Sequence, residues 1–401
     1  MKPDTPIAVN PRSGSYRKIL TRDFVLCFFS QFAFTSVFHI LIPTLPIYLS
    51  RLGSTEVEIG VLVGVIGVSS LIFRPLVGRA LLRIPEKRFM ILGAILMTLS
   101  SAAYLWVSSF WLFLIVRILQ GISLALFYTA TITLVANISP EEHRGQTISY
   151  YYLAFNISFA LSPSLGMLLI NHFNFTVLFL ACIGLSLCSL FIADKLGPRV
   201  MAPPKNRPPE EDSFFSRKAL SPSIMVFFIH IIWGTLTAFF PLYALKQGVE
   251  NPGPFFASYA IIIILGRALG GRILDTHDRE KVIFPCMTTY IISMTILSFS
   301  KTLPMFILVG VIWGIGNAFL LPIIVAEVLD RVGPARGPAM GTFTAISDLG
   351  IGIGPVIMGV VLRFTDYPTM FLFLAFTGLI NLNYFFFFMR KRKEARCPAT
   401  E

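Results

Sequence analysis

The sequence predicts an all-helical membrane protein with twelve transmembrane helices in two similar six-helix bundles. Three observations support this fold class: an apolar composition, apolar runs of membrane-spanning length, and a repeat of the first half of the chain in the second. Of the 401 residues, 55% are hydrophobic and only 13% are charged, whereas a soluble domain has about 25% charged residues. A water-soluble fold could not bury this much apolar surface.

The apolar runs have about 20 residues or more, the length that crosses a hydrocarbon core of about 30 Å as a helix. The first six predicted spans are 24–50, 58–81, 89–108, 110–137, 147–171 and 174–194. The second six are 222–246, 255–275, 282–300, 303–330, 338–363 and 367–389. Gly and Pro occur inside these runs, as they do in the helices of membrane bundles.

Lys and Arg in the short loops predict the orientation, because cytoplasmic loops carry an excess of both. With the N-terminus inside, 26 of these residues lie on the cytoplasmic side and 4 on the other. Losing or adding one span would misplace half of the basic loops, so both termini are expected in the cytoplasm. Because the charges lie between spans, the net charge of +12 does not indicate a nucleic-acid partner.

These patterns divide the chain into five segments. Residues 1–23 are expected to form a cytoplasmic N-terminal segment, and residues 24–194 the first bundle. Residues 195–221, rich in Pro and charge, are expected to form a semi-rigid cytoplasmic linker. Residues 222–389 form the second bundle, and residues 390–401 a basic cytoplasmic tail.

The sequence offers no pattern typical of a metal site or a catalytic centre. The five cysteines show no metal-ligand spacing: Cys27, Cys182, Cys188, Cys286 and Cys397. The sequence has no Walker-type phosphate loop, no His/Asp cluster at helical spacing and no paired nucleophile and base. We therefore expect no enzymatic activity, no metal and no cofactor, and a monomer whose partners are a small-molecule solute and the lipid bilayer.

The halves repeat one another at an offset near 193 residues. The matched positions in the first half are Pro46-Ile47-Tyr48, Arg74, Gly78, Arg79, Arg144-Gly145 and Pro163. Their counterparts are Pro241-Leu242-Tyr243, Arg267, Gly271, Arg272, Arg336-Gly337 and Pro355. Because each unit has six spans, both copies have the same orientation, and the solute is expected between the halves near mid-membrane.

Four motifs resemble those of the major facilitator superfamily. They are Gly78-Arg79-Ala80-Leu81-Leu82-Arg83, Arg117-Ile118-Leu119-Gln120-Gly121, Ser139–Gly145 and Ser162-Pro163-Ser164-Leu165-Gly166. The resemblance covers all twelve spans. It implies a secondary transporter that works by alternating access, and the last motif, in the fifth span, is associated with exporters in that family.

One departure from the family pattern concerns acids at the cytoplasmic edge. The family places acids where this sequence has Leu82 and Asn137, whereas the second half has Asp275 and Glu327 at the corresponding places. We expect a latch of one conformation in the second half, formed by Asp275, Glu327, Arg272, Arg279 and Arg336. The alternative is a set of ordinary loop charges with solvated acids.

Asp348 is the first candidate for coupling transport to protons. It lies about ten residues into the eleventh span, or about 15 Å, near the bilayer centre, where ionisable residues are costly and count as functional candidates. A carboxylic acid that is removed from water takes up a proton more readily. The repeat places the neutral Asn156 at the equivalent depth. A buried Asp hydrogen-bonded to a neighbouring helix is the alternative.

The other ionisable residues within spans are weaker candidates. Arg117 in the fourth span needs an acidic partner, a backbone acceptor or an aqueous cavity, and the resemblance implies a role in proton transfer or anion contact. His39 and His230 have side chains that titrate in the physiological range, although a lone His in a helix is more often a packing residue. Arg74 and Arg267 are expected to reach the inner surface, one helical turn before the loop glycines.

The sequence predicts a transporter, and its resemblance to the family implies a proton-coupled exporter of a small organic compound, a drug or metabolite. The short loops and compact size are typical of a protein in the inner membrane of a bacterium. Proton-coupled uptake of a metabolite is the main alternative. A membrane-embedded enzyme, a lipid flippase or a receptor is a more distant one.

Overall fold

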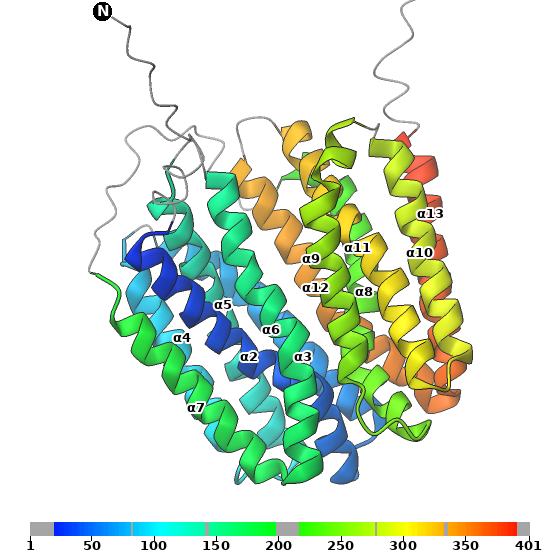
Figure 1. Ribbon diagram of the computed structural model, residues 1–401, viewed down its shortest axis with the longest axis horizontal. Coiled ribbons are helices and arrows are strands. Elements are labelled where there is room, and N and C mark those ends of the chain that lie inside the picture. The colour runs from blue at the N-terminus through cyan, green and yellow to red at the C-terminus, as the bar shows by residue number, and fades with distance from the viewer. Residues whose placement is uncertain are drawn as a thin grey trace, which may run out of the picture.

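The computed structural model describes residues 20–81, 83–140, 144–197, 216–276, 279–332 and 336–390. These residues form twelve helices and a closing π-helix (Figure 1). The first half contains α2 (Arg22–Arg51), α3 (Glu56–Ala80), α4 (Glu86–Ala103), α5 (Phe110–Ile138), α6 (Arg144–His172) and α7 (Phe175–Asp194). The second half contains α8 (Arg217–Lys246), α9 (Gly253–Thr276), α10 (Arg279–Phe299), α11 (Leu303–Val332), α12 (Arg336–Phe364) and α13 (Tyr367–Tyr384), followed by η3 (Phe385–Arg390).

The helices have the length and composition of membrane spans. Ten of them, within the described ranges, are long and apolar enough to cross a membrane. The two others are α4, which carries Glu86, Lys87 and Arg88 at its start, and α9, whose described apolar part is Gly253–Arg267. The predicted fold class, an all-helical membrane protein with twelve helices, is confirmed.

The helix ends differ from the predicted spans where a helix continues past the apolar run. Helix α8 begins at Arg217, so residues 217–221, which we assigned to the linker, are helical. Backbone hydrogen bonding continues into polar sequence, whereas hydropathy marks only the part inside the hydrocarbon. Most of the predicted N-terminal segment, linker and basic tail lies outside the described residues.

Both ends of the described chain lie at the same end of the bundle. In Figure 1, α2 (blue) begins and η3 (red) closes at the upper end, as an even number of crossings requires. We call this the terminal end and the opposite one the far end. Three helices that begin at the far end have polar caps, in which the side chains of Thr55, Asn174 and Asp366 accept hydrogen bonds from backbone N–H groups. Hydrogen bonds from Thr369 hold the pKa of the Asp366 carboxyl below its ordinary value.

The internal repeat is visible as a duplicated contact at the far end. Arg51, at the end of α2, lies over the ring of Phe175 with its guanidinium carbon 5.3 Å from the ring centroid. Lys246, at the end of α8, lies over the ring of Tyr367 at 5.4 Å. In each half, a cation over an aromatic ring therefore joins the end of the first helix to the start of the last helix.

The halves meet along two helix pairs related by the repeat, α3 with α12 and α6 with α9. A Cβ atom on Gly60 of α3 would lie 2.3 Å from the backbone oxygen of Pro355 in α12. A Cβ atom on Gly253 of α9, the counterpart of Gly60, would lie 2.5 Å from the Cα atom of Ser164 in α6. Both pairs therefore approach at a glycine near the far end, and these two interfaces position the candidate site.

Candidate functional site

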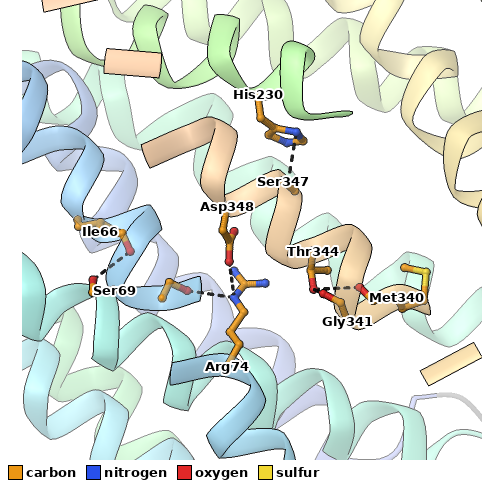
Figure 2. A network of polar contacts seen from close by, with 10 residues as sticks. Ile66, Ser69, Arg74, His230, Met340, Gly341, Thr344, Ser347 and Asp348 are labelled. Atoms are coloured by element: carbon orange, nitrogen blue, oxygen red, sulfur yellow. Dashed lines mark hydrogen bonds and ion pairs between the residues drawn. The ribbon is translucent and has the colours of Figure 1, made fainter. Parts of the chain in front are cut away.

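An ion pair joins the two halves within the membrane-spanning part of the bundle. The Nε atom of Arg74, on α3, lies 2.9 Å from the Oδ2 atom of Asp348, on α12. The side chains are 21% and 8% exposed, respectively. Figure 2 shows them pointing toward one another from their two helices. The acid that the sequence singled out thus has a charged partner in the other half of the protein.

Two further groups hold the guanidinium of Arg74. Its Nε–H donates to the hydroxyl of Ser70, one turn earlier on α3, at 3.0 Å. Its carbon atom lies 5.6 Å from the ring centroid of Tyr128 on α5. Because Nε has a single hydrogen, which is directed to Ser70, the contact with Asp348 is a close charge pair without a second aligned hydrogen bond from that atom. This pairing corrects the expectation that Arg74 reaches the membrane surface.

Glycines bring the backbones of α3 and α12 together beside the ion pair. A Cβ atom on Gly64 would lie 2.1 Å from the oxygen of Gly352. A Cβ atom on Gly67 would lie 2.6 Å from the backbone oxygen of Asp348. Small residues are what membrane helices use for such close approach. A similar approach joins α5 to α3 at Gly121, where a Cβ atom would lie 1.8 Å from the hydroxyl of Ser69.

His230 lies next to this pair on α8. Its Nδ1 atom is 3.0 Å from the backbone oxygen of Val226 and 3.3 Å from the hydroxyl of Ser347, the residue before Asp348 (Figure 2). A neutral ring can satisfy the carbonyl through Nδ1–H. One of the two predicted histidines, His230, therefore contacts the residue that precedes the predicted acid, Asp348.

The other histidine, His39, lies in a separate polar cluster inside the first half. Its Nδ1 atom is 2.8 Å from the hydroxyl of Ser158 on α6, and that hydroxyl is 3.1 Å from Ser36. The imidazole is fully buried and lies edge-on to Phe155 and Phe159. This surrounding is typical of a histidine that fixes helix packing, the alternative that the sequence left open.

Arg117 is buried against backbone acceptors. Its Nε–H donates to the oxygen of Leu62 on α3 at 2.7 Å, and Nη1 donates to Oε1 of Gln120 at 3.0 Å. The hydroxyl of Tyr104 donates to the same Gln120 oxygen at 2.8 Å. Of the three partners that the sequence allowed, the structure shows the backbone acceptor, and it also places Arg117 beside a cavity.

That cavity lies between the halves and has a volume of about 30 Å³, space for about two water molecules. Helices α2, α3, α5, α8 and α12 line it, with Phe38, Arg117, Trp233 and Thr237 among the lining residues. Its walls are mostly apolar and aromatic, with one cation. The cavity lies between the two bundles, where the repeat predicts the solute, but its volume is that of about two water molecules. Solute binding at this place therefore stays a prediction.

The predicted latch of the second half is described only at Glu327. Its Oε1 atom lies 2.8 Å from Nε of Arg331, one turn away on α11. The helices α9, α10 and α12 carry the predicted partners, but the side chains of Arg272, Asp275, Arg279 and Arg336 lie outside the described residues. The latch therefore stays a prediction.

The first half has an acid at its own terminal edge that the motif comparison missed. Glu86, at the start of α4, is 2% exposed, and its Oε1 atom accepts a hydrogen bond from Nδ2 of Asn137 at 2.8 Å. The adjacent Lys87 pairs with Asp194 at the end of α7, at 3.2 Å. Glu86 lies four residues after position 82, so a comparison at fixed motif positions does not detect it.

The remaining predicted residues lie on the helices as follows. Gly78 and Arg79 end α3, and a Cβ atom on Gly78 would meet no atom within 4 Å. Pro163 and Pro355 lie inside α6 and α12, and Gly271 lies in α9. Asn156 lies half-buried in α6, on the helix that meets α9.

The chain is similar to transporters along nearly its whole length. The Major Facilitator Superfamily profile matches residues 27–275 and 253–401. The staphylopine export protein of Staphylococcus aureus (strain Mu50) is 24% identical over 364 residues, which cover 86% of this chain and 89% of that protein. The quinolone resistance protein NorA of Staphylococcus aureus (strain MSSA476) is 22% identical over 360 residues, covering 85% and 90%.

Solved structures agree on the fold. The nucleoside transporter NupG superposes with a TM-score of 0.76 at 14% identity, and the match covers 91% of this chain and 98% of that one. A POT family transporter in complex with 5-aminolevulinic acid gives a TM-score of 0.76 at 14% identity, covering 92% and 96%. At this identity the likeness establishes the fold and not the solute.

The family and its relatives are transporters, in agreement with the prediction that the chain is not an enzyme. The profile match and the ten helices that are long and apolar enough to cross a membrane also confirm a multi-pass membrane protein. The chain belongs to the Major Facilitator Superfamily of membrane transporters.

Proposed function

We propose that this transporter is a proton-coupled exporter of a small organic compound, in which Asp348 carries the proton. The observation that supports this proposal is the Arg74–Asp348 pair at 2.9 Å, because it joins the two halves that must move relative to one another. Similarity to an export protein over 86% of the chain supports the direction.

The ion pair links the charge of one side chain to the arrangement of the halves. While Asp348 is ionised, its attraction to Arg74 favours the conformation in which α3 and α12 are packed together. A proton on Asp348 removes that attraction and leaves the guanidinium with Ser70 and Tyr128 alone. Protonation therefore favours separation of α3 and α12 at this level, and release of the proton favours their return.

The coupling cycle follows if the terminal end faces the cytoplasm, as the loop charges predict. Asp348 takes up a proton when the far side is open, and cargo leaves on that side. The halves then rearrange, and the proton is released to the cytoplasm as the pair with Arg74 forms again. One proton enters for each cargo molecule that leaves, so an inward proton gradient drives export.

Gradient-driven flux in proteoliposomes tests the proposal, with purified full-length protein and with a fluorescent quinolone and staphylopine as probes. In wild-type protein, an imposed pH gradient is expected to drive probe movement against the direction of proton flow. In Asp348→Asn, exchange of probe without a gradient is expected to persist while the response to the gradient is lost. Asp194→Asn is the matched control, because that side chain is 70% exposed at the terminal end.

Three results would contradict parts of the proposal. Gradient dependence that persists in Asp348→Asn would show that another group carries the proton. Probe movement in the same direction as the protons would favour the uptake alternative. Wild-type flux that does not depend on the pH gradient would show that transport is not coupled to protons. A thermal melt of each variant separates these results from a failure to fold.

A further inference from the structure

The repeat that produces the Arg74–Asp348 pair also predicts a second pair, which the chain leaves incomplete. Arg267 on α9 is the counterpart of Arg74, and Asn156 on α6 is the counterpart of Asp348. Helices α9 and α6 pack as α3 and α12 do, with Gly253 against Ser164 where the other pair has Gly60 against Pro355. At this second interface an uncharged amide takes the place of the carboxylate.

Arg267 has lost both polar partners that hold Arg74. The hydroxyl of Ser70, which accepts from Arg74, is replaced by the aliphatic Ile263 at the equivalent position. Within the described residues no acidic side chain pairs with Arg267, and the Asn156 amide has no hydrogen-bond partner there. The Arg267 side chain is exposed and that of Asn156 is half-buried.

The depth of Arg267 makes a missing partner costly. It lies 14 residues after the start of α9 at Gly253, or about 21 Å from the far end of the helix and well inside the span. An arginine at such a depth requires an anion, a backbone acceptor or water. Because α9 runs from the far end inward, its side chains lean back toward the far end, in the direction of the interface with α6.

Aromatic side chains lie next to this position on the far side. The ring centroid of Phe159, one turn from Asn156, is 5.6 Å from that of Tyr259 and 6.2 Å from that of Trp233. Trp233 also lines the cavity between the halves. The neighbourhood therefore combines an exposed cation and an amide donor with flat apolar surfaces.

We propose that Arg267 and Asn156 bind the carboxylate of the cargo, and that the cargo is an organic anion with an aromatic or apolar body. The cargo then supplies at the α6–α9 interface the negative charge that Asp348 supplies at the α3–α12 interface. The guanidinium of Arg267 pairs with the carboxylate, and the amide N–H₂ of Asn156 donates to it. An aspartate at position 156 would instead repel the carboxylate of the cargo and pair with Arg267 itself. The uncharged amide avoids both effects.

This inference rests on the proposed transport of a small organic compound, but its test requires no proton gradient. The probes are indole-3-acetate and benzoate, each compared with its uncharged amide, and the measurement is the thermal unfolding midpoint of full-length protein in detergent. At least one carboxylate is expected to raise the midpoint of the wild type, and its amide is not. Midpoint shifts titrated against concentration then give apparent affinities.

Two variants test the residues directly. Arg267→Gln is expected to weaken carboxylate binding about tenfold or more, because a charge-assisted hydrogen bond is lost. Asn156→Asp is expected to weaken it at least as much, since the new carboxylate occupies the partner of Arg267. Arg363→Gln, at the far end of α12, is the matched control and is expected to bind as the wild type does.

A cargo-independent readout uses the same variants. If positions 156 and 267 face one another, Asn156→Asp raises the unfolding midpoint of the unliganded protein, and the increase disappears in the Arg267→Gln background. The proposal is overturned if no carboxylate stabilises the wild type more than its amide does, or if both variants bind carboxylate as the wild type does. Carboxylate binding without pH-driven flux would contradict the proposed function alone.

Discussion

The two interfaces between the halves share a backbone arrangement and differ in their side chains. In the α3–α12 interface, Gly64 meets Gly352 and an ion pair joins the helices. In the α6–α9 interface, alanines replace both glycines at the equivalent positions, and Phe159 packs against Phe256 and Tyr259. The α3–α12 interface is narrow and charged, whereas the α6–α9 interface is aromatic.

This difference shows how a duplicated fold can carry different chemistry at equivalent positions. The repeat sets the helix directions and the level at which they cross, because these depend on small residues and on helix length. The chemistry at each crossing then depends on a few substitutions, above all the exchange between Asp348 and Asn156. We infer that the narrow interface handles the proton and the aromatic one the cargo.

The largest effect is expected from removing the charge at the narrow interface. Asp348→Ala leaves Arg74 unpaired, and breaking a buried ion pair costs about 3–5 kcal/mol, with the lower value expected because Arg74 is 21% exposed. Asn156→Ala at the aromatic interface is expected to change stability by less than about 0.5 kcal/mol. Unfolding of the purified variants in detergent checks this contrast.

A double variant sharpens the same test. Arg74→Gln combined with Asp348→Asn removes both charges, so its loss of stability is expected to be smaller than the sum of the two single losses. The contrast between the interfaces would be contradicted if the alanine variants at positions 348 and 156 lost equal free energy of unfolding. It would also be contradicted if the losses of the two single charge variants added up strictly in the double variant.

A smaller effect is expected from the narrowness of the α3–α12 interface. Gly64→Ala places a Cβ atom 2.1 Å from a backbone oxygen, which forces the helices apart at a cost of about 1–3 kcal/mol. Gly184→Ala, where a Cβ meets no atom within 4 Å, is the control and is expected to stabilise α7 by up to about 1 kcal/mol. If both changes have the same effect on the unfolding midpoint, the close approach is not required.

The smallest effect is expected where the halves do not differ. Arg51→Ala and Lys246→Ala each remove one cation from an aromatic ring at the far end. Each is expected to cost about 0.5–1 kcal/mol, and the two losses are expected to be equal within error. A clear inequality in the unfolding midpoints would show that the repeat has diverged at the far end too.

Much of the fold could be predicted from the sequence because membrane helices are specified locally. A run of apolar residues must become a helix wherever it crosses the hydrocarbon, since its backbone groups have no other partners there. The repeat was also detectable, because Arg74 and Arg267 keep their spacing to the loop glycines. Helix α8 begins at Arg217, before the predicted span, because backbone hydrogen bonding continues past the apolar run.

The candidate site was predicted only in part. Asp348 was found from its depth, and Arg117 and His230 were correctly noted as polar groups within the spans. The position of Arg74 one turn before the loop glycine predicts that it reaches the membrane surface, whereas the structure pairs it with Asp348. Glu86 was missed because it lies four residues from the motif position where an acid is expected.

The sequence by itself determined the number of spans, their parity, the repeat and the acid at mid-membrane, because each depends on residue type and spacing along one segment. Only the tertiary structure decided that Asp348 faces Arg74, that Arg117 donates to the backbone of α3, and that α6 meets α9. Those outcomes depend on the rotation and tilt of helices about their axes, which many weak packing contacts fix together. The residue pattern of one membrane helix does not show which of its faces packs against another helix, because lipid and neighbouring helices are equally apolar.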